Sequence, residues 1–281
     1  GTEPQSLDPH IATGVPEHHI IMALMEGLVH KDSDTLGPTP GVAESWTVSD
    51  DGRVYTFKLR DDARWSNGDE HNAHDFVWSW WRALQPALGN LYAYMYFPIL
   101  NAREYYKGEV TDFSKVGVKA LDDLTLQITL NNPTPYFLQL LDHYSMYPVH
   151  KGTVEKFGAP DERGTRRTYA GNLVGNGPFK LASWEINRAI EVERNIFYWG
   201  NDDVKLNKIV FYPTENLTTE ERMFRAGQLH YTNEVPIDKV QTYRAANDPA
   251  LKLTPYLGTY FYRINVNEPH LQDKRVRRAL G

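Results

Sequence analysis

The sequence predicts a fold of the α/β (mixed α+β) class, in which strands and helices are partly segregated and partly alternate. Three observations lead to this expectation: segments with period-2 alternation of apolar and polar residues, helix starts marked by capping residues, and one hairpin pattern. The 281 residues suffice for one large domain or two ordinary ones. A hydrophobic share of 41% and an aromatic share of 12% supply an ample core.

Two half-buried antiparallel strands are predicted, at residues 54–59 and 124–130. Both segments alternate apolar and polar residues. Turn residues stand before each of them, Asp50-Asp51-Gly52 before the first and Asp122-Asp123 before the second.

A helix is predicted between these strands, because Asn72 can cap a first turn in which Asp75 is favoured near the positive end. Gln85-Pro86 ends it, since proline cannot continue the hydrogen-bond pattern. The helix is expected to cover the sheet with an apolar face made of Phe76, Val77, Trp80 and Leu84.

The later part of the chain is predicted from its turn and capping residues. The expected elements are a helix after Thr134-Pro135 with the apolar run 136–141, a hairpin over 177–194 that turns at Asn187-Arg188, a helix from Thr218 to Gly227, and strands at 209–212 and 251–264.

Composition excludes several classes of protein. The net charge of -6, without a long basic run, argues against nucleic-acid binding, because phosphate contacts need clustered Lys and Arg. The basic residues 274–278 are expected to be a solvated helix face. No apolar run approaches the roughly 20 residues of a membrane span. Cysteine is absent, which excludes disulfides and thiolate metal sites. Because the chain starts at Gly1 without an apolar leader, any export signal is expected to have been removed or never present.

No coherent catalytic constellation is found, so we expect no enzyme, no cofactor and no metal. His71 and His74 have a spacing that could hold a metal on a helix, but no Glu follows as in zinc proteases, and Asn72 begins the helix between them. The sequence has no Gly-x-Ser-x-Gly nucleophile motif. Its paired Asp residues flank turns, where Asp caps backbone amides.

Residues 41–68 resemble the signature of the extracellular solute-binding proteins that serve importers of peptides, nickel and related solutes. The matching pieces are Gly41-Val-Ala-Glu-Ser-Trp46, Thr47-Val-Ser-Asp-Asp-Gly52, Tyr55-Thr-Phe-Lys-Leu-Arg60 and Ala63-Arg-Trp-Ser-Asn-Gly68. Further pieces are similar to the oligopeptide-binding branch. They are Gln5-Ser-Leu-Asp-Pro-His10, Gly14-Val-Pro-Glu17, Glu26-Gly-Leu28, His74-Asp-Phe76, Gly117-Val-Lys-Ala-Leu-Asp122, Asn176-Gly-Pro-Phe179, Glu193-Arg-Asn195, Tyr198-Trp199 and Arg275-Val-Arg-Arg-Ala-Leu280.

The resemblance implies a periplasmic-binding-protein-like lobe with an inserted smaller α+β domain. Residues 1–25 and 150–256 would form the discontinuous first lobe, and residues 26–149 the inserted domain. Residues 257–281 would begin a second lobe that is truncated, so the second lobe is missing. The implied function is that of the substrate-binding component of an ABC peptide importer, which binds oligopeptides by backbone pairing in an interlobe cleft. Binding is expected to be impaired in this short chain.

Six candidate peptide-binding residues follow from the resemblance. Thr13, Gly14 and Val15 would offer a strand edge to the peptide, and Tyr92 would lie over the ligand. From the residues alone, the first three form an ordinary loop, and Tyr92 could equally pack with Tyr94 and Tyr96 in its own domain. Asn233 and Phe261 match cleft-facing positions more loosely, and a structural role is the alternative for both.

The resemblance also implies the partners and the location. The partners are an oligopeptide ligand and an inner-membrane ABC permease, and self-association through the exposed cleft face is expected. The location is the periplasm, or the outer surface with a membrane anchor in a Gram-positive host. Alternatives remain a truncated paralogue or fragment that does not bind, or a binder of nickel, haem or an oligosaccharide. The seven Trp residues suit sugar stacking, although Trp46, Trp65 and Trp80 fall in expected core positions.

Overall fold

The computed structural model describes residues 1–254 and 261–280 and divides into two compact units, 1–233 and 234–281. The predicted boundary between a first and a second lobe, at residues 256 and 257, lies outside the described residues. The second compact unit begins at Glu234. It contains α7 (Ile237–Ala245) and α8 (Lys274–Ala279). No helix in the described part of the chain is long and apolar enough to cross a membrane.

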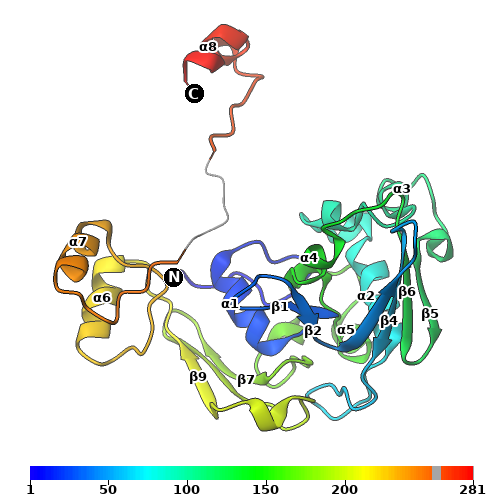
Figure 1. Ribbon diagram of the computed structural model, residues 1–281, viewed down its shortest axis with the longest axis horizontal. Helices are drawn as coiled ribbons and strands as arrows, with labels where there is room; N and C mark the ends of the chain where they lie inside the picture. Colours follow the sequence, from blue (N-terminus) through cyan, green and yellow to red (C-terminus); the bar gives the residue numbers. More distant parts are fainter. Residues whose placement is uncertain (255–260, 281) are drawn as a thin grey trace. The chain divides into compact units, whose positions relative to one another are not determined.

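An antiparallel four-stranded sheet forms the first half of the larger unit, with the strand order β3-β4-β6-β5 (Figure 1). The strands are β3 (Ala43–Val48), β4 (Val54–Leu59), β5 (Val118–Asp122) and β6 (Thr125–Thr129). The predicted strands at 54–59 and 124–130 are confirmed as β4 and β6. Their alternating pattern buries Phe57, Leu126 and Ile128 completely, which is why these two strands lie in the middle of the sheet.

Helix α2 (Ala73–Ala83) packs against this sheet and confirms the helix predicted after Asn72 (Figure 1). The Asn72 side chain accepts a hydrogen bond from the His74 amide at 2.9 Å, and Asp75 accepts one from the Asn72 amide at 2.9 Å. This reciprocal pair is a capping box. Phe76 and Trp80 are fully buried, and the Trp80 indole donates to the carbonyl of Met146 at 2.9 Å.

A second, three-stranded sheet has the order β7-β8-β9. The predicted hairpin is confirmed as β7 (Phe179–Glu185) and β8 (Ala189–Arg194), with Asn187 in the left-handed region at φ 59°. The predicted strand at 209–212 is confirmed as β9 (Lys208–Phe211). Helix α1 (Val15–Leu24) packs against β7.

Two separate hydrophobic cores result. The sheet core contains buried residues between 28 and 146, and the hairpin core contains buried residues from 7–25, from 144 and 147, and from 173–192. Residues far apart in the sequence therefore share the hairpin core. The division into a discontinuous lobe and an inserted domain stays a prediction.

Two predicted helices begin elsewhere than expected. The helix after Thr134-Pro135 is the short α4 (Phe137–Leu141), because Tyr136 has a turn conformation and precedes the first helical residue. The helix predicted from Thr218 is α6 (Leu217–Arg225), and its cap is Asn216, which accepts from the Thr219 amide at 2.9 Å. Asn is a stronger N-cap than Thr. The predicted stop at Gly227 is confirmed by its φ of 73°.

The remaining strands and α-helices of the larger unit are short. They are β1 (Val29–Lys31), β2 (Pro38–Pro40), α3 (Ala102–Tyr106) and α5 (Lys151–Phe157). The predicted strand at 251–264 is wrong for 251–254 and 261–264, which are not in a strand, and its middle lies outside the described residues.

Candidate functional site

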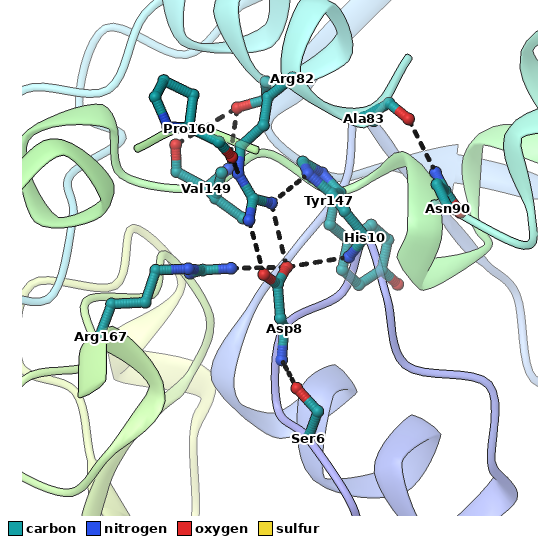
Figure 2. Close-up of polar contacts among 11 residues, drawn as sticks. Ser6, Asp8, His10, Arg82, Ala83, Asn90, Tyr147, Val149, Pro160 and Arg167 are labelled. Atoms are coloured by element: carbon teal, nitrogen blue, oxygen red, sulfur yellow. Dashed lines mark hydrogen bonds and ion pairs between the residues drawn. The ribbon is translucent and has the colours of Figure 1, made fainter. Parts of the chain in front are cut away.

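A buried polar cluster holds the stretch of chain that precedes the predicted binding segment (Figure 2). The Asp8 carboxylate accepts two hydrogen bonds from Arg82 of α2, from Nη2 at 2.7 Å and from Nη1 at 3.1 Å. Arg167 Nη2 lies 2.5 Å from Asp8 Oδ1. Arg82 Nε also donates to the carbonyl of Pro160 at 2.7 Å. One carboxylate therefore joins three stretches that are far apart in the sequence.

His10 is the neutral member of this cluster. Its Nδ1 lies 2.9 Å from Arg82 Nη1, and its Nε2 lies 3.0 Å from the carbonyl oxygen of Tyr147. A guanidinium only donates and a carbonyl only accepts, so Nε2 carries the proton and Nδ1 accepts. Burial, together with the positive charge of Arg82, lowers the pKa of His10 to about 3.

The Asp8 carboxylate is charged at neutral pH. Burial by itself would raise its pKa, but the positive charges of Arg167 and Arg82 outweigh burial and hold the pKa of Asp8 well below its usual range. The backbone of the same turn is fixed as well, because the amides of Ile11 and Ala12 both donate to the carbonyl of Asp8. The cluster thus sets the path of the chain up to Ala12.

Two tyrosines hold the next two carbonyls. The Tyr144 hydroxyl donates to the carbonyl of Ala12 at 3.0 Å, and the Tyr92 hydroxyl donates to the carbonyl of Thr13 at 3.3 Å. The structure therefore brings together Thr13 and Tyr92, two candidate residues that are 79 positions apart. Tyr144 was not predicted from the sequence as part of the site.

The predicted strand edge at Thr13, Gly14 and Val15 needs a correction. Val15 is the first residue of α1 and is 61% exposed, so it is not part of a strand. Pro16 in the first turn of α1 explains this start, because its fixed φ suits the first helical positions. Thr13 precedes the helix and is exposed. Gly14 is the N-cap, with an extended backbone at φ -96° and ψ 158°.

Glycine at position 14 leaves room for the side chain of Glu17. A Cβ atom on Gly14 would lie 1.9 Å from Glu17 Oε2. The Glu17 carboxylate is buried there and accepts a hydrogen bond from the Gln5 amide at 2.7 Å. The space beside Gly14 is thus filled by a side chain of the protein itself.

Aromatic rings lie around Tyr92, whose hydroxyl bonds the carbonyl of Thr13. The Tyr92 ring lies 4.7 Å from the His143 ring, 6.0 Å from the Tyr144 ring and 6.1 Å from the Tyr94 ring, between centroids. Burial, followed by the neighbouring charge of His18, lowers the pKa of His143 to about 4. At neutral pH the surface around Tyr92 therefore consists of uncharged rings beside an exposed backbone.

The other two candidate residues lie elsewhere. Asn233 lines a separate groove of about 920 Å³, whose wall also includes Pro16, Phe211 and Tyr231. Phe261 is 63% exposed and belongs to the second compact unit.

His71 and His74, whose spacing in the sequence could hold a metal, lie in two different environments. His71 is buried, its ring stacks on Trp65 at 4.6 Å, and its Nδ1 lies 3.0 Å from Asp75 Oδ2. The His74 side chain is 63% exposed, and its Nε2 lies 3.4 Å from Asp123 Oδ1. In residues 1–254 and 261–280, no group of three or more His, Cys, Asp or Glu side chains is placed to hold a metal ion.

A second buried carboxylate, Glu26, joins three of the motifs that carry the family resemblance. Its oxygens accept hydrogen bonds from the Tyr198 hydroxyl at 2.6 Å and from the Trp199 indole at 2.7 Å, and His30 Nε2 lies 2.5 Å away. The Asn176 side chain bonds both the amide and the carbonyl of Glu26. Glu26 lies where the chain passes from the hairpin core to the sheet core. Its hydrogen bonds therefore fix the backbone between the two cores.

Comparison with known proteins identifies the family. The family described as "Bacterial extracellular solute-binding proteins, family 5 Middle" matches residues 37–281. The chain is 42% identical to the periplasmic oligopeptide-binding protein OppA of Escherichia coli over 285 aligned residues, which cover 100% of this chain and 50% of that protein.

Solved structures give the same result. The structure of Haemophilus influenzae OppA in complex with RPPGFSPFR matches with a TM-score of 0.92 and 37% identity, covering 100% of this chain and 54% of that one. The structure of Burkholderia pseudomallei OppA also matches with a TM-score of 0.92, at 33% identity, covering 99% of this chain and 53% of that one. The chain spans about half the length of the curated relatives that it matches. It belongs to family 5 of the bacterial extracellular solute-binding proteins.

Proposed function

We propose that this chain supplies the first half of the binding site of an oligopeptide-binding protein, which delivers peptides to an ABC permease. The proposed location is the periplasm, or the outer surface of the cell with a membrane anchor. We propose further that the chain is a binding module without catalytic activity.

The observation that carries this proposal is the fixed backbone at Ala12 and Thr13. Tyr144 holds the carbonyl of the buried Ala12, and Tyr92 holds that of the exposed Thr13, which leads into the extended Gly14 beside uncharged aromatic rings. Such a stretch suits a ligand that is recognised by its main chain, because every peptide has the same backbone groups. The neighbouring rings can accept varied side chains.

The isolated chain is expected to bind peptide weakly. Two-lobed binding proteins enclose the ligand when one lobe closes on the other, and closure excludes water from the cleft. A single solvent-exposed hydrogen bond contributes about 0.5–1.5 kcal/mol. Ordering one peptide residue costs about 1–2 kcal/mol. One lobe therefore provides contacts that roughly offset the ordering of the ligand.

A chimera tests the proposal directly. Residues 1–281 would replace the matching half of the Escherichia coli relative, and calorimetry with tri- to pentapeptides would measure affinity for the chimera and for the isolated chain. We expect micromolar or tighter binding by the chimera, weakened by Tyr92→Ala, and little heat from the isolated chain. Tyr136→Ala, at an exposed tyrosine away from Thr13, serves as the matched control. A folded chimera that binds no peptide would contradict the proposal.

Two further properties belong to the same proposal. Assays with esters, peptides and glycosides should show no turnover; robust turnover that is lost in His71→Ala or His74→Ala would overturn the non-catalytic assignment. The isolated chain 1–281 should also self-associate, because the proposed cleft face stays exposed when no second lobe covers it. Sedimentation that shows a strict monomer at high concentration would count against this.

A further inference from the structure

We propose that Trp78 and Trp81, on the outer face of α2, form a binding site for a short oligosaccharide that is separate from the peptide site. The two residues are three positions apart and therefore lie on the same side of the helix. Their ring centroids are 5.8 Å apart, and their planes are inclined by 50°. Both are half-buried, whereas Trp80 between them is fully buried on the opposite side.

The two indoles line a shallow hollow with a volume of about 420 Å³. This volume falls within the range of about 300–1,000 Å³ that is usual for small-molecule sites. Its walls also include Val77 and Phe113, and its polar lining consists of Asn72, His74, Asp75 and Lys151. None of these residues belongs to the surface around Thr13 and Tyr92.

The indole N–H groups of this pair differ from those of the other hydrogen-bonded tryptophans. In the described part of the chain, the indoles of Trp65, Trp80, Trp184 and Trp199 each donate a hydrogen bond. No hydrogen bond of the described residues uses the indole N–H of Trp78 or Trp81. Two donors therefore lie on two half-buried indole rings, of which Trp81 also packs against the sheet core.

The polar lining favours a ligand rich in oxygen atoms. Asp75 is already occupied by the Asn72 amide and the Trp65 indole, so its carboxylate is engaged within the protein. Lys151 adds a group that can donate and lies 3.8 Å from the exposed Glu155, whereas His74 Nε2 already lies 3.4 Å from Asp123 Oδ1. The lining thus holds one carboxylate and one ammonium group, and Lys151 can donate to hydroxyl or carboxylate oxygens of a ligand.

A pyranose has the matching chemistry. The C–H groups on one face of the ring are weakly positive and stack on the negative face of an indole, while the hydroxyls at the ring edge accept hydrogen bonds. The two inclined indoles can contact neighbouring sugar units. The inferred ligand is a neutral or acidic oligosaccharide of two or three units.

Nuclear magnetic resonance of the indole N–H signals tests this inference on the chain 1–281. The probes are chitotriose, which is neutral, and trigalacturonate, which is acidic. Trp78→Phe and Trp81→Phe assign the two signals, which we expect to shift as either probe is added, while the Trp184 signal stays unchanged. Trp78 lies outside both hydrophobic cores, so Trp78→Ala should fold normally and should weaken binding at least tenfold.

The control is Trp184→Phe, whose side chain contacts Glu3 on another part of the molecule and which should leave saccharide binding unchanged. Lys151→Ala should weaken trigalacturonate binding more than chitotriose binding. The inference is overturned if neither saccharide shifts the Trp78 and Trp81 signals at tens of millimolar, or if the shifts persist in folded Trp78→Ala. It does not depend on the outcome of the peptide experiments.

Discussion

Replacing Asp8 by alanine should destabilise the protein strongly, because the carboxylate neutralises two buried positive charges. The substitution leaves the Arg82 and Arg167 side chains, which are 0% and 4% exposed, without their shared partner. His10 cannot compensate, because it is neutral and already accepts from Arg82. Removing one partner of a buried ion pair costs about 3–5 kcal/mol, since the remaining charge stays buried without compensation.

The effect should depend on pH in one direction. The pKa of Asp8 is lower in the folded state than its ordinary unfolded value of about 3.9. The carboxylate therefore stabilises the fold above about pH 4. This contribution is lost as the pH falls through the lower, folded-state pKa. The difference in the free energy of unfolding between the wild type and Asp8→Asn should accordingly become smaller in strongly acidic solution.

Urea unfolding, followed by tryptophan fluorescence at pH 7, measures the difference in free energy. Asp34→Ala is the matched control, because it removes the same charge from an exposed position and should change stability by less than about 0.5 kcal/mol. For Asp8→Ala, the free energy of unfolding could fall by less than about 1 kcal/mol while its slope against urea concentration stays unchanged. That result would refute the electrostatic reasoning, because breaking a buried ion pair costs more.

Three further predictions concern other contacts. Asn72→Ala removes the acceptor of the His74 amide and should lower the free energy of unfolding by about 1 kcal/mol in the same urea assay; an unchanged midpoint would show that the capping box is dispensable. Gly175→Ala would place a Cβ atom 2.0 Å from the carbonyl oxygen of Leu24, a backbone atom that cannot rotate away, so we expect a loss of about 1–3 kcal/mol, against little change for Gly37→Ala. Burial lowers the pKa of His30, but its hydrogen bond and ion pair with Glu26 outweigh burial and raise it overall. The stabilisation from His30 is thus complete below its ordinary pKa of about 6.5 and is lost as the pH rises through the folded value. His30→Gln should therefore cost more stability at pH 5.5 than at pH 8.5, and an equal cost at both values would contradict the pairing.

Local sequence patterns predict a structural feature correctly where all the residues that determine it are neighbours in the sequence. The capping box at Asn72 and Asp75 and the left-handed turn residue Asn187 were predicted correctly, because each depends on a few consecutive residues. The start of α1 was missed even though Pro16 and Glu17 are typical of a first helical turn. The family resemblance implies a strand edge at this point, whereas these local residues indicate the helix that the structure shows.

The arrangement around the candidate site could not be predicted in this way. Asp8, Arg82 and Arg167 are buried together only because distant elements pack against one another, and no local pattern specifies that packing. The same holds for Tyr144, whose hydroxyl reaches a carbonyl 132 positions away. The motif around Asp8 and His10 was recognised in the sequence, but its role as a support for Thr13 required the structure.

The composition of the hairpin core has a consequence for synthesis on the ribosome. Ile20, Ile21 and Leu24 leave the ribosome long before Ile190 and Val192, which complete their packing. At translation rates of about 5–20 residues per second, on the order of ten seconds pass between the synthesis of α1 and that of β7 and β8. The sheet core, which is complete at Met146, can close during that interval. The nascent chain therefore exposes an apolar helix beside an already folded neighbour, and α1 is where a chaperone would be expected to bind.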